Sequence, residues 1–513
     1  MSQQEEKSGL GLGTAFLVVV PIVGVVVYRF AKHPLKSLPG PVSKSAFYGN
    51  AREFGSTSWS ETNRFPEPFT TWTKKYGGAF YYRVFFYHRV NLSDPQALKH
   101  VLVTNSTNYP RSDVSRAIFQ NMTDGQGLLN SEDPLHAAQR KTFQPQFTHN
   151  EIKSYISIFD KETQTLEKYL DENEGSVLDI PDTITRLTLN IIGKAAFSYD
   201  FKTFDKNNEQ AKVVLDSFEL LNAPPKFLYT MGLIYIPGFK HWPLQLLKQI
   251  NKAKKALYEI IENVIEHKSA LQSINNQRDL LDMMLASNEM TPKEARVHVM
   301  TFMFAGHETT SNTLCWILAM LSQHPEVEVK VAEECFQAIK TYGATWDIVD
   351  KLPFLTATIK ETMRMYPTAP FIASRVCLQD DNIPLSDGTS FYIPKGSHVS
   401  FSTGAINRNP LYWSQPDMFL PERFIESSSI YEEDRNLRNG RGNTFMYMPF
   451  SAGSKNCIGK RFALVEMQLV LAKLLSKYKF SCTSDAVLFP KMTGVTIKPK
   501  NLKMTVHRRT SAL

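Results

Sequence analysis

A loop near the carboxyl end of the chain carries a cysteine in a setting that favours a metal-binding thiolate. The segment 450–459 reads FSAGSKNCIG and places Cys457 between two glycines. Apolar residues recur at helical spacing from Ile458 onward, so we expect Cys457 at a helix amino terminus, where partial positive charge favours the thiolate. Gly453 and Gly459 would let the backbone approach a planar ligand and donate N–H groups to the sulfur. The alternative is an inert buried cysteine, because most single cysteines behave as small hydrophobes.

A second segment whose residue types could take part in catalysis or binding lies inside a predicted helix of unusual length. Residues 291–324 begin with a capping box, TPKE, and then keep a helical composition without interruption. In the middle, the segment 305–310 reads AGHETT and brings Gly306 together with an acid, Glu308, and a hydroxyl, Thr309. Glycine inside a helix costs about 1 kcal/mol relative to alanine, so its presence suggests close approach by something small or flat. Close contact with another helix explains the glycine equally well.

The elements that must position these segments are mostly helical. Residues 81–92 (YYRVFFYHRVNL) are aromatic and β-branched without helical period, which predicts a pair of strands, and Ser-Asp-Pro at 93–95 then opens a helix. Helical periodicity dominates from about 150 to 340. Short strands and turns follow between Pro367 and Pro421. The predicted fold class is therefore mainly α with a small β portion.

The amino-terminal region predicts a membrane anchor. Residues 10–28 are uncharged and long enough, at about 1.5 Å per residue, to cross a hydrocarbon core of about 30 Å. Basic residues follow this segment, so the carboxyl side is expected in the cytosol. A cleaved signal peptide would carry its basic residues on the other flank. The predicted organisation is a short tail (1–9), a transmembrane helix (10–28), a basic and proline-rich linker (29–45) and one catalytic body (46–513).

Composition excludes several other classes of protein. A chain of 513 residues with 42% hydrophobic and 21% charged residues is globular rather than disordered. Its five cysteines are odd in number and widely spaced, which argues against a disulfide framework and for a reducing compartment. A net charge of +8 without a dense basic block argues against nucleic-acid binding. A cationic surface facing anionic lipid or an acidic protein fits better, although a surface with no partner is equally compatible.

The segment around Cys457 resembles the haem-binding loop of the cytochrome P450 family. The resemblance implies the cytochrome P450 fold, with haem b as cofactor and the Cys457 thiolate as the ligand of the haem iron. The matching positions, which the family places around the haem, are Phe450, Gly453, Cys457, Gly459 and Ala463.

Further segments match the same family in the same order. Glu361 and Arg364 resemble its Glu-x-x-Arg helix, and Arg423 stands in a segment similar to the one that completes a buried charge network with that helix. The resemblance extends over essentially the whole chain, including the anchor.

The resemblance also implies which residues hold the haem propionates. The segment HAAQR at 136–140 stands where many members have Trp-x-x-x-Arg, so Arg140 and His136 are expected near one propionate. Arg375 matches the strand arginine that contacts the other. Lys455 stands where Arg or His is more common and is expected to reach a propionate as a point charge, without the bidentate fork of arginine.

The AGHETT segment matches the oxygen-binding groove of the family. The resemblance implies monooxygenase chemistry, with O2 as co-substrate, Gly306 making room for oxygen, and Glu308 and Thr309 delivering protons. Because the chain has no recognisable nucleotide or flavin motif, electrons would come from a membrane flavoprotein, an NADPH-cytochrome reductase. The expected location is the endoplasmic reticulum membrane, with a single span and a cytosolic catalytic domain.

Two other functions remain open at this point. One is a haem-thiolate isomerase or dehydratase that needs no O2, although such enzymes tend to lose the acid–alcohol pair Glu308 and Thr309. The other is a tethered haem-binding sensor without enzymatic activity. Oxygen consumption that depends on NADPH would distinguish the three.

The substrate is expected to be an apolar small molecule. A steroid or other lipid is favoured, and a terpenoid, fatty acid or xenobiotic is possible. By the resemblance, the substrate pocket should draw on residues 112–130, 216–240, 368–374 and 492–496.

Overall fold

The computed structural model describes residues 32–53, 59, 65–223, 227–271, 279–286 and 290–509. The predicted tail and transmembrane helix at 1–28 lie outside these residues, so the anchor stays a prediction. Within the described ranges, none of the helices combines the length and apolar character needed to cross a bilayer.

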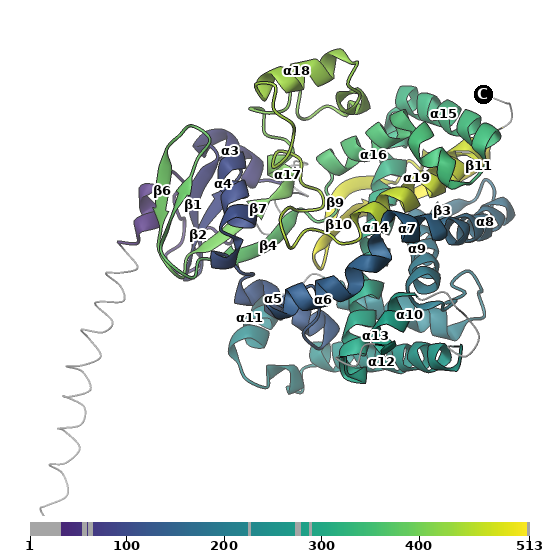
Figure 1. Ribbon diagram of the computed structural model, residues 1–513, viewed down its shortest axis with the longest axis horizontal. Helices are drawn as coiled ribbons and strands as arrows, with labels where there is room; N and C mark the ends of the chain where they lie inside the picture. Colours follow the sequence, from purple (N-terminus) through teal and green to yellow (C-terminus); the bar gives the residue numbers. More distant parts are fainter. Residues whose placement is uncertain are drawn as a thin grey trace, which may run out of the picture.

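Helices make up most of the body, as the sequence predicts, and the described residues between 150 and 340 are helical apart from short connections and one three-residue strand (Figure 1). The helices are α3 (Phe69–Tyr76), α4 (Pro95–Lys99), α5 (Asp113–Thr123), α6 (Leu135–Phe143), α7 (His149–Ser154), α8 (Ile156–Glu172), α9 (Ile180–Phe197), α10 (Glu209–Leu221), α11 (Phe227–Tyr235), α12 (Gln245–Leu271), α13 (Leu280–Ala286), α14 (Pro292–Gln323), α15 (Pro325–Tyr342), α16 (Pro353–Met365), α17 (Thr403–Ile406), α18 (Ser429–Leu437) and α19 (Lys460–Lys477).

The β portion is small and its main sheet lies at one side of the helical body (Figure 1). That sheet has the order β1-β2-β7-β4, and the predicted strand pair at 81–92 is confirmed as its antiparallel β1–β2 hairpin. Smaller sheets are β3-β11-β8, β9-β10 and β5-β6. The strands are β1 (Ala79–Val84), β2 (Tyr87–Leu92), β3 (Val177–Asp179), β4 (Phe371–Val376), β5 (Asp381–Pro384), β6 (Ser390–Ile393), β7 (His398–Ser402), β8 (Tyr478–Cys482), β9 (Val487–Thr493), β10 (Thr496–Asn501) and β11 (Lys503–Arg508).

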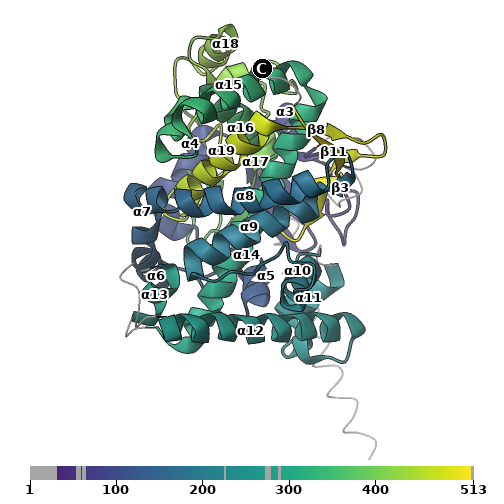
Figure 2. The ribbon, with the colours of Figure 1, turned by 90° about the vertical axis from the view of Figure 1, so that its right-hand side faces the viewer.

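The long predicted helix is confirmed as α14. Thr291 is its N-cap, and the side chains of Thr291 and Glu294 bond each other's backbone N–H groups in a complete capping box. The helix ends before His324 and has 32 residues, a length of about 48 Å. Figure 2 shows α9 over α14; α9 packs against α14, and α14 is buried along most of its length.

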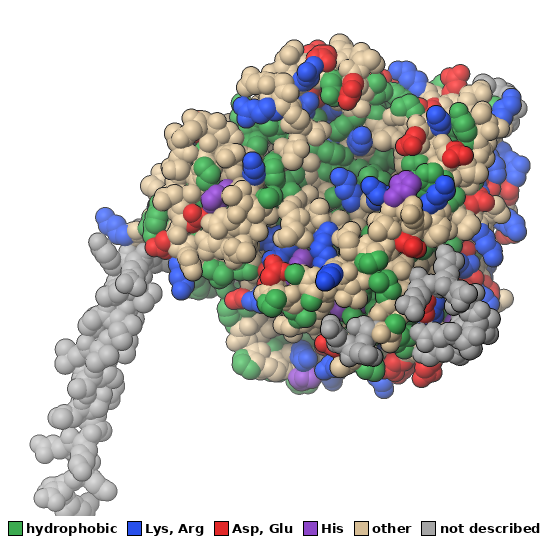
Figure 3. Space-filling view, viewed as in Figure 1, with side chains coloured by type: hydrophobic (Ala, Val, Ile, Leu, Met, Phe, Trp, Pro, Cys, Tyr) green, Lys and Arg blue, Asp and Glu red, His purple; other side chains and the backbone are tan. Residues whose placement is uncertain are grey.

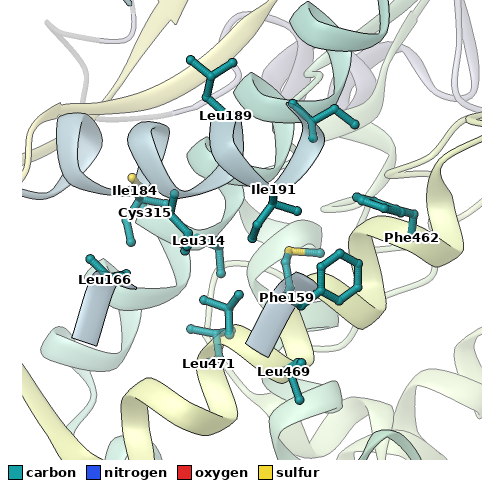
Figure 4. Packing of buried hydrophobic residues seen from close by; sticks show 14 of the residues in the cluster. Phe159, Leu166, Ile184, Leu189, Ile191, Leu314, Cys315, Phe462, Leu469 and Leu471 are labelled. Carbon is teal, nitrogen blue, oxygen red and sulfur yellow. The ribbon is translucent and has the colours of Figure 1, made fainter. Parts of the chain in front are cut away.

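One large apolar cluster fixes the helices that carry the two candidate segments. Side chains from α8, α9, α14 and α19 interlock in it, among them Phe159, Ile191, Leu314 and Leu469, each at most 1% exposed (Figure 4). Close packing of this kind resists relative movement of the helices. The cluster therefore holds α14, with the AGHETT segment, against α19, which follows the cysteine loop.

The folded body begins earlier than the sequence predicts. Leu35 is fully buried in the apolar cluster of the main sheet, and the N–H of Tyr81 donates to the carbonyl of Pro39 at 2.9 Å. A Cβ on Gly40 would lie 2.0 Å from the carbonyl oxygen of Tyr81, so only glycine fits there. The end of the predicted linker at 29–45 therefore belongs to the sheet rather than to a free spacer.

Candidate active site

The cysteine loop is closed by its own backbone. The N–H of Cys457 donates to the carbonyl of Phe450 at 3.0 Å. Gly453 has a φ of +77°, and a Cβ there would lie 1.9 Å from the carbonyl oxygen of Leu102. Only glycine therefore allows the loop to adopt this conformation next to Leu102. The helix begins at Lys460, slightly later than the apolar pattern suggests, and Cys457 stands just before it.

Cys457 is the cysteine that the fold leaves accessible. Of the five cysteines, all of them described, Cys315, Cys335 and Cys377 are buried and Cys482 is half-buried, whereas Cys457 is exposed. This result contradicts the alternative of an inert buried cysteine.

The surroundings of Cys457 do not by themselves produce a thiolate. Although the Cys457 side chain is exposed, desolvation by the protein around it raises the pKa of the thiol, and the N–H of Gly459 and the charges of Arg140 and Lys460 oppose that rise without cancelling it. The expected preference for the thiolate at the helix start is therefore outweighed by desolvation. Coordination to a metal cation deprotonates a thiol outright, so the site suits a cysteine that binds metal.

Arg375 is a buried cation with one guanidinium nitrogen that has no partner among the described residues. Its side chain lies on β4 and is 3% exposed, and its Nη1 atom has no hydrogen-bond partner among the described residues. Burial, helped by the charge of Arg111, lowers the pKa of Arg375 to about 10. A buried guanidinium without an anion is costly. The carboxylate of a haem propionate would meet this need, so Arg375 fits its predicted role.

Arg140 and His136 lie together on α6, as predicted. Arg140 binds the cysteine loop directly, donating from Nη1 to the carbonyl of Asn456 at 2.8 Å and from Nη2 to its Oδ1 at 2.6 Å. His136 is 2% exposed, and burial lowers its pKa to about 4, so the ring is neutral near pH 7. Their contact with a propionate stays a prediction.

Lys455 has a different partner from the one expected. Its Nζ lies 2.5 Å from Oε2 of Glu132 and 3.7 Å from Oδ2 of Asp133. Glu132 also accepts a bond from Arg111; burial opposes its ionisation, but the bonds from Lys455 and Arg111 outweigh burial and lower its pKa. The propionate role of Lys455 is therefore not supported, because a carboxylate of the protein already balances its charge.

Gly306 is explained by helix packing. A Cβ at this position would lie 2.8 Å from the side chain of Ile192 on α9, so the glycine permits close approach of α9 to α14. The expectation that Gly306 makes room for oxygen stays a prediction. Thr309 donates from Oγ1 to the carbonyl of Ala305 at 2.8 Å, a local bond common for threonine in helices. A role for Thr309 in proton delivery stays a prediction.

Glu308 has the properties of a group that exchanges protons near neutral pH. The side chain is 6% exposed; Oε1 accepts a hydrogen bond from the hydroxyl of Thr496 at 2.7 Å, and Oε2 has no partner among the described residues. Burial raises the pKa of Glu308 to about 7, although bonds from Thr496 and Thr493 act against the rise. The two threonines belong to the β9–β10 hairpin, and no motif in the sequence pointed to this contact.

The predicted charge network is present and fully buried. Arg364 donates to Glu361 from Nε at 2.7 Å and from Nη2 at 2.8 Å, and Nε of Arg423 donates to the same carboxylate at 3.1 Å. Arg423 also pairs with Asp434 at 2.6 Å, a residue that sequence reasoning missed. None of these side chains has exposed surface, so the network anchors α16 to the segments that precede the cysteine loop.

An apolar pocket lies between α5, α10, α11 and α12. Three of the four predicted substrate segments contribute to it, and the segment 368–374 does not. The lining residues are Ala117, Ile118, Asn121, Met122, Leu220, Leu221, Ala223, Tyr229, Thr230, Leu233, Ile234, Leu246, Ile250 and Gly494.

Comparison with known proteins shows the family to which the chain belongs. The sequence model of the cytochrome P450 family matches residues 39–506, and the chain belongs to this family. Cytochrome P450 monooxygenase claP of Ampulloclitocybe clavipes is 27% identical over 92% of this chain and 90% of its own length. Cytochrome P450 monooxygenase 205 of Postia placenta is 29% identical over 92% of this chain and 91% of its own length. Human cytochrome P450 4F12 is 31% identical over 69% of this chain and 68% of its own length.

The chain is thus a haem-thiolate monooxygenase that uses haem b, O2 and a redox partner and acts on hydrophobic substrates. When bound, haem would supply the oxygen chemistry, and a thiolate ligand would favour that chemistry. Cys457 would provide that thiolate, and Arg375 would bind a propionate; both roles stay predictions that fit the exposed thiol and the unpartnered guanidinium nitrogen.

Proposed function

We propose that this protein is a membrane-bound monooxygenase that hydroxylates a lipid, with a steroid or related molecule as the favoured substrate. The apolar pocket carries the proposal: eleven of its fourteen lining residues are hydrophobic or glycine, and the three others are Asn121, Tyr229 and Thr230. Pockets of this composition bind ligands by burying apolar surface, and a few polar groups orient them. A terpenoid, fatty acid or xenobiotic would satisfy the same pocket.

We further propose that the electrons come from an NADPH-cytochrome reductase that docks on the face where Cys457 is accessible. The groove at Cys457 is lined by Arg140, Lys360, Lys460 and Arg461 and by a single carboxylate, Asp350. Figure 3 shows basic side chains gathered on this face, between the positions of α16 and α7. Such a surface favours an acidic partner and steers its approach.

In this proposal, residues of the chain deliver protons to the site and hold the enzyme at the membrane. Glu308, with a pKa of about 7, can hold or release a proton near neutral pH. Thr309, the next residue on α14, would pass it toward the reacting oxygen. The uncharged segment 10–28 would hold the enzyme in the endoplasmic reticulum membrane, where apolar substrates partition.

The test is turnover of the full chain in membranes with a reductase. We expect NADPH-dependent oxygen consumption that rises with an apolar lipid and yields a hydroxylated product. Product without NADPH would indicate an isomerase or dehydratase, and haem binding without turnover of any compound would indicate a sensor.

The docking face is tested separately. Arg461→Glu should slow reduction of the haem by the reductase, by roughly tenfold at low salt, without lowering haem content. Lys479→Glu, at an exposed lysine of β8 outside the groove, is the matched control. Equal reduction rates in the two variants would reject this face as the docking site.

A further inference from the structure

A chain of hydrogen bonds runs from α12 through α5 to α11 and ends in the apolar pocket. Nζ of Lys254 donates to Oδ1 of Asn121 at 3.0 Å, and Nδ2 of Asn121 donates to the hydroxyl of Tyr229 at 3.0 Å. Asn121 and Tyr229 both line the pocket, and α5 and α11 lie side by side beneath the main sheet (Figure 1). The pocket therefore has a polar group at one point of an otherwise largely apolar wall.

The direction of these bonds follows from the groups themselves. An ammonium group has donors and no acceptor, so Lys254 must face the carbonyl oxygen of the Asn121 amide. The amide nitrogen must then face Tyr229, whose oxygen accepts that bond. The hydroxyl hydrogen of Tyr229 is left to point elsewhere, and no acceptor for it is found among the described residues. Burial raises the pKa of Tyr229, so the phenol keeps this hydrogen.

Lys254 also lacks an anion. It is 6% exposed, and in the described parts of the chain no carboxylate lies within ion-pair distance of its Nζ. The nearest acid that affects it electrostatically, Asp124, already pairs with Lys240 at 3.7 Å. Burial lowers the pKa of Lys254 to about 8, so most of the positive charge remains at neutral pH. A buried cation balanced by no nearby carboxylate favours an anionic ligand.

We infer that Tyr229, oriented by Asn121 and Lys254, binds an acceptor oxygen on the substrate, and that a carboxylate is the preferred acceptor. The substrate would then be amphipathic, with an apolar body and an oxygen-bearing end held by Tyr229. This inference rests on the proposed function and names the group by which the lipid is recognised.

Binding to the full haem-loaded enzyme tests the inference, with the shift of the ferric haem spectrum as the readout. The probes are a long straight-chain carboxylate, its methyl ester and the alkane of the same length. Wild type should bind them in that order of affinity. Tyr229→Phe should weaken binding of the ester about three- to tenfold and of the carboxylate by about tenfold or more, with little effect on the alkane. Tyr235→Phe makes the same change on α11 outside the pocket and should alter none of them.

Lys254→Met tests the charge separately. It should weaken binding of the carboxylate by roughly tenfold and of the ester by less, because only the carboxylate gains from the cation. Equal losses for both would reject the preference for a carboxylate.

Two outcomes overturn the inference while leaving the proposed function intact. In one, wild type binds the alkane as tightly as the carboxylate and the ester. In the other, Tyr229→Phe weakens all three probes equally, which would mean that the hydroxyl serves packing alone. If wild type binds and oxidises no lipid of any kind, the proposed function itself fails.

Discussion

Replacing Glu308 by glutamine should change how the stability of the protein depends on pH. The Glu308 carboxyl is 6% exposed, and burial raises its pKa from an ordinary 4.5 to about 7. The folded protein therefore holds a proton on Glu308 between about pH 4.5 and pH 7, where the unfolded chain has lost it. Because the folded state binds more protons in this window, the free energy of unfolding falls as the pH rises through it.

The size of the effect follows from the two pKa values. A difference of this size corresponds to about 3 kcal/mol between the ends of the window. Below about pH 4.5 both states are protonated and Glu308 adds no pH dependence, whereas above about pH 7 the full penalty applies. Glutamine has the shape of the protonated acid and never ionises. The free energy of unfolding of Glu308→Gln, relative to that of wild type, should therefore rise by up to about 3 kcal/mol between about pH 4.5 and above pH 7.

Urea titrations of the full chain in detergent, at pH values from about 5 to about 8, measure this difference. Thr496→Val removes the hydroxyl that lowers the pKa of Glu308, so it should extend the upper end of the pH-dependent window to higher pH and leave the lower end unchanged. Glu259→Gln, at an exposed glutamate of α12, should keep the wild-type slope. If the free energy of unfolding varies with pH in the same way for wild type and Glu308→Gln, the raised pKa of Glu308 is refuted. The main support for Glu308 in proton delivery is then lost.

Four further predictions follow from the site. Cys457→Ala should abolish the strongly red-shifted Soret band of the reduced carbon monoxide complex; survival of that band would disprove the ligand assignment. Deleting residues 1–28 should release much of the protein from membranes with haem still bound, and full retention in the membrane pellet would place the anchor elsewhere. Thr309→Ala should raise the peroxide formed per NADPH and lower product at matched haem content, whereas unchanged coupling would leave Thr309 a structural residue. Arg375→Leu should lower the haem-to-protein absorbance ratio of the purified enzyme, and an unchanged ratio would argue against its contact with a propionate.

Features that depend on neighbouring residues were predictable from the sequence. The limits of α14 follow from the capping box at Thr291 and from the proline after His324, and both signals are local. The β1–β2 pair and the Asp94 cap of α4 are local in the same sense. The network around Glu361 was also predictable, but only because the family resemblance supplied the distant partner.

Features that depend on distant partners were not predictable. Lys455 pairs with Glu132, which lies 323 positions away in the sequence, and no periodicity marks such a pair. For Gly306 the sequence indicates that something approaches closely, but only the packing of α9 identifies it as Ile192. The contact of Thr496 with Glu308 is of the same kind, since it joins the central helix to a hairpin near the end of the chain.

Two residues give the best support for a haem site. One is a thiol that a metal cation would deprotonate, and the other is a buried guanidinium that an anion would balance. The surroundings of Cys457 raise the pKa of its thiol, and Nη1 of the buried Arg375 has no hydrogen-bond partner among the described residues. Another side chain of the protein could have balanced either group, as Glu132 balances the charge of Lys455. A bound haem would suit both, because its iron would take the thiolate and its propionate would carry the negative charge that the guanidinium needs. Burial of the Arg375 guanidinium is costly for stability, and binding of this cofactor would account for it.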